Sequence, residues 1–107
     1  MENECGVTEI SLENARYLVG KYGIPDRIRL HNDPKEGHVV TVTWPHQGLS
    51  DSLVWDFTGF SWGYSGEGPH GLVKFFDLCH LNISIQEVAS MDAEKEMVFN
   101  LDNAIKG

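Results

Sequence analysis

The sequence predicts a single small α+β domain, in which helices pack on one face of an antiparallel sheet of three to four strands. Two segments with helical spacing of apolar residues flank a central region in which apolar and polar residues alternate. The connections in this region are short and rich in turn residues, which favours antiparallel hairpins over parallel crossovers. The chain has 107 residues, 41% of them hydrophobic, which suffices for one modest core. Residues 1–107 are therefore expected to form one domain.

The first helix is expected at residues 11–22, with Ser11 as its N-cap. Gly23 follows at the position where a glycine commonly ends a helix. Residues 1–9 are expected to form a loosely ordered tail. The apolar face of the helix comprises Leu12, Ala15, Leu18, Val19 and Tyr22.

Three strand segments follow, DRIRLH at 26–31, HVVTVTW at 38–44 and SLVWDFTGF at 52–60. In each segment, apolar residues alternate either with polar residues or with smaller β-branched ones. The segments 32–37 and 45–52 between them are dense in turn residues. These features predict a meander of three strands.

Two more helices are expected after the strands. The longer begins near Pro69 and ends at 80–82, and the shorter covers 85–90. Ser84 and Glu87 form a capping-box pattern at the start of the shorter one. The longer has an apolar stripe of Leu72, Phe75, Phe76 and Cys79.

The C-terminal residues 93–107 fit two structures. Met97, Phe99 and Leu101 alternate as in an edge strand, whereas Ala93 and Met97 also suit a helix. We favour the strand.

The charge of the chain limits its partners. Sixteen acidic residues stand against eight basic ones, a formal net charge of −8. Such a surface repels nucleic acids and anionic membranes and favours solubility or a basic partner. Arg27 and Arg29 give the first strand a basic face, for which cross-strand ion pairs are the expected role. Nucleic acid and membrane are therefore not expected as partners.

The cysteines and the N-terminus favour a cytoplasmic protein. Cys5 and Cys79 fall in a polar tail and an apolar helix, a placement that does not favour a disulfide. The N-terminus shows no signal-peptide pattern, and no apolar run is long enough to cross a bilayer.

The segment TGFSWGYSGEGPHGL at 58–72 is the most informative part of the chain. Four glycines lie between a strand and a helix, where backbone amides can bind an anion. The spacing matches a dinucleotide fingerprint, but Pro69 removes an amide and Glu67 places a carboxylate where the phosphate would sit. The preceding meander is also unlike a βαβ unit. No cofactor is expected.

Two interpretations of this segment remain open. The glycines form either a purely structural turn or a site for a ligand or partner. An anion would use the amides of His70, Gly71 and Leu72, with Lys74 one turn further on. The candidate site has aromatic walls, close-approach glycines and polar contacts, namely Trp62 and Tyr64, Gly66, Gly68 and Gly71, and His70 and Lys74.

The same segment resembles the signature of a family of short phage and bacterial proteins of unknown function. Their pattern is T-G-F-x-W-G-Y-x-G-x-G-P followed by an amphipathic helix, and the similarity covers residues 57–80. Family members often have a small residue where this chain has Glu67. The resemblance implies a small independent α+β domain and no particular activity.

Catalytic and metal sites are not favoured by spacing. The five histidines and two cysteines do not show metal-ligand spacing. Ser61, Ser65, Glu67 and His70 lie close together in sequence, but nearness in sequence does not establish a triad. We expect no catalytic residue, and we keep as an alternative a small enzyme that uses His70 or Glu67 as an acid–base group.

These observations favour a small intracellular binding module. It would engage a protein partner or a small anionic ligand at the glycine-rich turn, residues 58–74. A second alternative is a phage-type inhibitor of a host protein.

Overall fold

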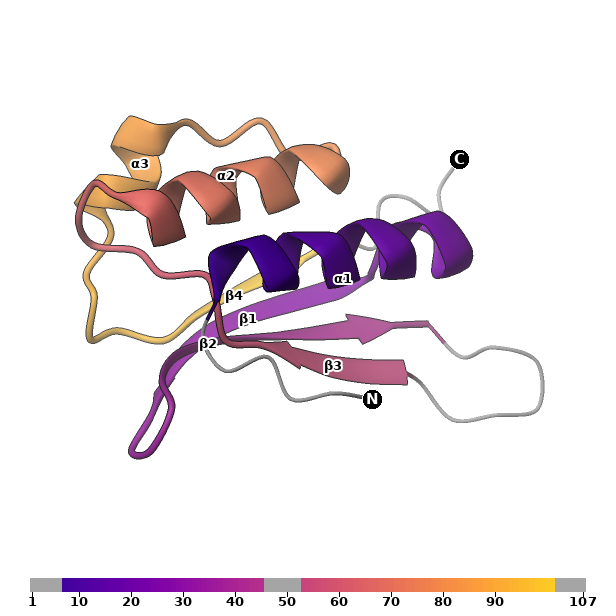
Figure 1. Cartoon of the computed structure of the whole chain (residues 1–107), viewed down its shortest axis with the longest axis horizontal. Helices are drawn as coiled ribbons and strands as arrows, with labels where there is room; N and C mark the ends of the chain where they lie inside the picture. Colours follow the sequence, from indigo (N-terminus) through magenta and orange to yellow (C-terminus); the bar gives the residue numbers. More distant parts are fainter. Residues whose placement is uncertain (1–6, 46–52, 102–107) are drawn as a thin grey trace.

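The computed structural model describes residues 7–45 and 53–101, and it confirms the predicted α+β fold (Figure 1). A four-stranded antiparallel sheet carries three helices on one face. In chain order the elements are α1 (Thr8–Tyr22), β1 (Arg27–Asp33), β2 (Gly37–Trp44), β3 (Leu53–Phe57), α2 (Glu67–Leu78), α3 (Ile85–Ser90) and β4 (Met97–Asn100).

The sheet has the strand order β3-β2-β1-β4. Ile28 of β1 pairs with Val42 of β2 and with Phe99 of β4, so the side chains of these three residues lie on the same, helix-covered face of the sheet. This register follows from the alternation of side chains, because a slip of one residue would turn every apolar side chain to the opposite face. The expected C-terminal strand is thus confirmed as the edge strand β4, and residues 102–107 lie outside the described part.

The core lies between the sheet and the helices. The apolar stripe of α2 is buried there as predicted. Phe75 contacts the rings of Phe57 and Phe60, with centroids 5.3 and 5.5 Å apart. A buried phenylalanine stabilises a fold by about 1.5–3 kcal/mol. This aromatic cluster therefore joins α2 to β3 and to the segment that connects them.

The prediction of Ser11 as an N-cap is wrong, because α1 begins at Thr8 and its N-cap is Val7. Ser11 is buried inside the helix, where its Oγ accepts a hydrogen bond from the amide of Gly59. Residues 8 and 9 therefore belong to the helix and not to a loose tail.

Other local predictions are confirmed. The Ser84–Glu87 capping box is present with both of its hydrogen bonds. Gly23 has φ 88° and donates its amide to Val19 at the end of α1. The expected loop at 45–52 falls almost entirely outside the described residues.

The open face of the sheet carries the predicted arginines. Arg29 forms an ion pair with Glu96, next to β4, and this contact lowers the pKa of that carboxyl group. Both side chains are partly exposed (39% and 50%), so the pair adds little to stability. No helix in the described residues is long and apolar enough to span a membrane.

The turn between β3 and α2 is tied to the rest of the fold at Gly63. This residue has φ 90° and donates its amide to the carbonyl of Val88. A Cβ at this position would lie 2.6 Å from the Cβ of Ala93. Both the backbone conformation and the close packing therefore require glycine here.

Gly63→Ala is expected to lower the free energy of unfolding by about 2 kcal/mol or more, because it adds backbone strain and a steric clash. Gly20→Ala is the matched control, since Gly20 lies in α1 with open space around its Cα. Alanine there should raise stability by up to about 1 kcal/mol through helix propensity. Urea unfolding followed by circular dichroism measures both effects. Equal stability of the two variants would contradict this description of the turn.

Candidate functional site

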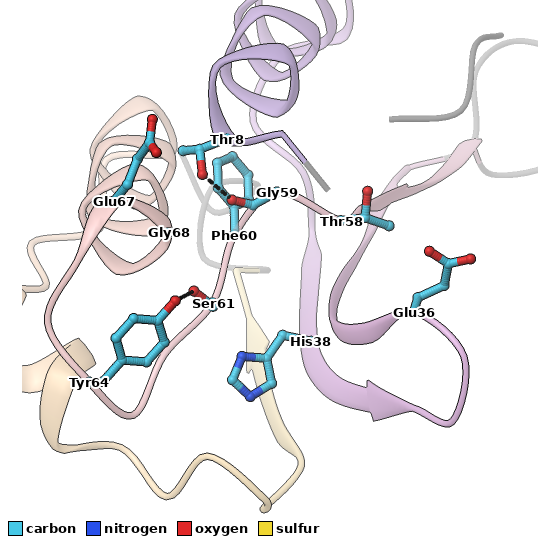
Figure 2. A pocket seen from close by; sticks show the side chains of 10 residues that line it. All are labelled: Thr8, Glu36, His38, Thr58, Gly59, Phe60, Ser61, Tyr64, Glu67 and Gly68. Atoms are coloured by element: carbon cyan, nitrogen blue, oxygen red, sulfur yellow. Dashed lines mark hydrogen bonds between the residues drawn. The ribbon is translucent and has the colours of Figure 1, made fainter. Parts of the chain in front are cut away.

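Two pockets lie on either side of Glu67, at the N-terminal ends of α1 and α2. The larger has a volume of about 450 Å³ and lies between the glycine-rich turn and the β1–β2 hairpin. Figure 2 shows Tyr64 and Glu36 on opposite sides of this pocket, with the ring of His38 between them. The lining thus comes from segments that are distant in sequence.

Tyr64 forms the exposed rim of the larger pocket. Half of its surface is exposed (51%), and its hydroxyl lies 2.9 Å from the Oγ of Ser61. Thr8 donates a hydrogen bond to the carbonyl of Gly59 across the same pocket, at 2.7 Å (Figure 2). These bonds hold the hydroxyl groups in place and leave oxygen lone pairs for further contacts.

His38 is positioned by two contacts. Its ring stacks on the indole of Trp62, with centroids 4.1 Å apart and planes 15° apart. Its Nε2 lies 3.1 Å from the carbonyl of Ala93. Because a carbonyl only accepts, Nε2 carries the proton, and Nδ1 of the neutral ring is then an acceptor.

The prediction that Trp62 forms an aromatic wall of the site is wrong. Its side chain is fully buried beneath the turn, so it supports His38 and cannot reach a ligand at the surface. Tyr64 alone keeps the exposed aromatic role.

The larger pocket is acidic. Glu36 and Glu67 contribute carboxylates, and no lysine or arginine is among the described residues that line it. Hydroxyl oxygens and the His38 ring add further acceptors. Such a lining suits a cationic group better than an anion.

The smaller pocket, of about 280 Å³, lies between α1 and α2. It receives three of the predicted site residues, His70, Gly71 and Lys74, together with Arg16. The structure therefore divides the predicted site: Tyr64 and Gly68 line the larger pocket, the three residues just named line the smaller one, and Trp62 and Gly66 line neither.

The predicted anion site at the amides of residues 70–72 is not formed. Helix α2 begins at Glu67, two residues earlier than predicted, so these amides lie inside the helix. The amide of His70 donates to the carbonyl of Gly66, and its Nδ1 lies 2.7 Å from the same oxygen. Gly71 is buried, and a Cβ there would collide with the methyl group of Thr8. Because Gly71 has no side chain, α2 can pack closely against α1 at this point.

A catalytic triad is not formed by the candidates in the turn. The hydroxyl of Ser61 pairs with Tyr64, whereas His70 lines the other pocket. Burial raises the pKa of the Cys79 thiol to about 12, which makes it a poor nucleophile. Among residues 7–45 and 53–101, no group of His, Cys, Asp and Glu could hold a metal ion.

Six lining residues outside the turn were not foreseen as site residues: Glu36 and His38, on the β1–β2 hairpin, and Thr8, Glu9, Leu12 and Arg16, on α1. No local motif marks them, because only the tertiary fold brings them beside the turn. The charge count offered a partial signal, since an acidic surface was expected to favour a basic partner.

No protein-family model matches this chain, and no curated protein or solved structure shows significant similarity to it. The resemblance to the short phage and bacterial family therefore stays a prediction.

A substitution at Gly68 tests how closely the residues around the larger pocket pack, because a Cβ there would collide with the side chain of Ser61. Gly68→Ala should lower stability by about 1–2 kcal/mol, although alanine favours helices. Adding Ser61→Ala should recover about half of that loss or more, since it removes the overlapping hydroxyl. Thermal unfolding of the single and double variants measures this coupling. A Gly68→Ala variant more stable than wild type would contradict the close packing.

Proposed function

We propose that this protein is a small binding module without catalytic function, which engages a protein partner at the glycine-rich turn. The larger pocket would receive a basic side chain of that partner. The observation that carries this proposal is the lining of the pocket, which contains the carboxylates of Glu36 and Glu67 and several hydrogen-bond acceptors but no lysine or arginine among the described residues.

The size and chemistry of the pocket support a lysine or arginine side chain as the bound group. A volume of about 450 Å³ has room for an arginine head and its stem. The guanidinium has five N–H donors, enough for one carboxylate and the hydroxyl oxygens near it, whereas Glu36 and Glu67 lie at opposite ends of the pocket (Figure 2). Tyr64 offers an exposed ring beside these groups, which suits both a cation and a protein interface.

The charge of the whole chain supports the same partner. A formal charge of −8 attracts a basic protein from a distance and speeds association at low salt. It opposes nucleic acid as a partner. A phage-type inhibitor of a host protein would be one form of this binding function.

The competing functions have less support. An anion at the turn would face Glu36 and Glu67 and would find the amides of residues 70–72 engaged in the helix. An enzyme using His70 or Glu67 as an acid–base group has less support, because Nδ1 of His70 is held by the Gly66 carbonyl and Glu67 is an exposed side chain. We place the protein in the cytoplasm, an assignment supported by the free, buried thiol of Cys79.

The test is a titration of the ¹⁵N-labelled protein with a short acetylated peptide containing one arginine. We expect saturable shifts of the amides of Ser61, Tyr64 and Gly68, and no such shifts with a citrulline peptide of the same length. Glu36→Gln or Glu67→Gln should weaken binding about fivefold, which corresponds to about 1 kcal/mol for one exposed ion pair.

Glu13→Gln is the matched control, because Glu13 is an exposed residue of α1 that does not line either pocket. It removes the same charge and should leave the affinity nearly unchanged. Equal weakening by all three substitutions would mean that only the net charge attracts the peptide. Equal shifts with arginine and citrulline peptides would contradict a cation-binding pocket.

A further inference from the structure

The acidic and basic side chains that line the smaller pocket are separated along the two helices. Helices α1 and α2 run side by side in the same direction (Figure 1), and each has a glutamate in its first turn. Seven residues later, each has a basic residue that lines the same pocket. The pairs are Glu9 with Arg16 on α1, and Glu67 with Lys74 on α2.

This spacing separates the charges along the groove between the helices. Seven residues correspond to two helical turns, a rise of about 10 Å. The glutamates thus lie at the N-terminal ends, where the helix dipoles favour negative charge. Arg16 and Lys74 lie further along their helices and line the same pocket, and neither has an ion-pair partner in the described part of the chain.

We propose that Arg16 and Lys74 form a binding site for an oxyanion, such as the phosphate group of a small phosphorylated molecule. The two cations come from different helices and line one pocket of about 280 Å³, a volume suited to a group of this size. Arginine offers paired N–H donors that match phosphate or carboxylate oxygens, and lysine adds a second charge. A bound dianion would also relieve the repulsion between the two cations.

The acidic end of the groove does not prevent anion binding. The backbone positions of the glutamates and of the two cations differ by a rise of about 10 Å, comparable to the Debye length of about 8 Å at physiological salt. Salt therefore weakens the repulsion between the glutamates and a bound anion. Nδ1 of His70 lies 2.7 Å from the Gly66 carbonyl oxygen, so this nitrogen is engaged within the protein. Arg16 and Lys74 therefore carry the site.

This site is independent of the proposed function, since it uses a different pocket and a ligand of opposite charge. An arginine peptide that shifts Ser61 and Tyr64 bears on the larger pocket alone. Phosphate binding bears on Arg16 and Lys74 alone, so either proposal can fail without the other.

The experiment is a titration of the ¹⁵N-labelled protein with sodium phosphate at pH 7.5, at constant ionic strength maintained with sodium chloride. We expect saturable shifts of the Arg16 side-chain Nε–H and of the amides around Lys74. Arg16→Gln or Lys74→Gln should raise the half-saturation concentration about fivefold or more. The double variant should lose the saturable response. Acetate, a monoanion, should bind more weakly than phosphate.

Lys35→Gln is the matched control, because Lys35 lies in the β1–β2 turn and does not line the smaller pocket. It should leave phosphate binding unchanged. The proposal would be overturned by shifts that do not saturate, by the same response in the double variant, or by equal weakening from Lys35→Gln. Since all three side chains are exposed, the ¹⁵N spectrum of each variant should retain the dispersion of the folded protein.

Discussion

Burial of Trp62 is the constraint on which the arrangement of the glycine-rich turn depends. The indole lies against the ring of His38 on β2, and none of its surface is exposed. The chain must therefore turn immediately after Trp62, which it does at Gly63 with φ 90°. The amide of Gly63 donates a hydrogen bond to the carbonyl of Val88, and the side chain of Ala93 packs against Gly63 where a Cβ would otherwise lie. Trp62 thus joins the turn to the sheet, and Gly63 joins it to α3 and to the segment after α3.

This arrangement explains why the turn looks like a ligand-binding loop and is built as a structural one. Gly63 and Gly71 are required by close packing, and the amide of His70 is used within α2. The polar and charged side chains that could bind a ligand lie beside the turn, in two pockets that share Glu67. The larger pocket combines acidic groups from the turn and the hairpin, and the smaller one has its basic residues two helical turns along the groove. We propose opposite ligands for them on this basis.

The sequence predicted the elements whose signals are local. The capping box at 84–87 and the alternation of the strands depend on neighbouring residues, and the structure confirms both. The prediction failed where a distant contact decides the outcome. Ser11 has the pattern of an N-cap, but its hydroxyl is used by Gly59, far along the chain. An aromatic residue among glycines suits a surface site or a buried anchor equally, so only the fold shows that Trp62 is buried on His38.

The central claim is that Trp62 is an internal anchor of the turn, and hydrogen exchange of its indole tests this most directly. Its Nε1 is buried and has no hydrogen-bond partner among the described residues, so only burial can protect it. Trp55, which is half-buried, provides an internal comparison. We predict that the Trp62 indole proton exchanges only on global unfolding, far more slowly than that of Trp55. Exchange of Trp62 as fast as Trp55 in the native protein would contradict the account.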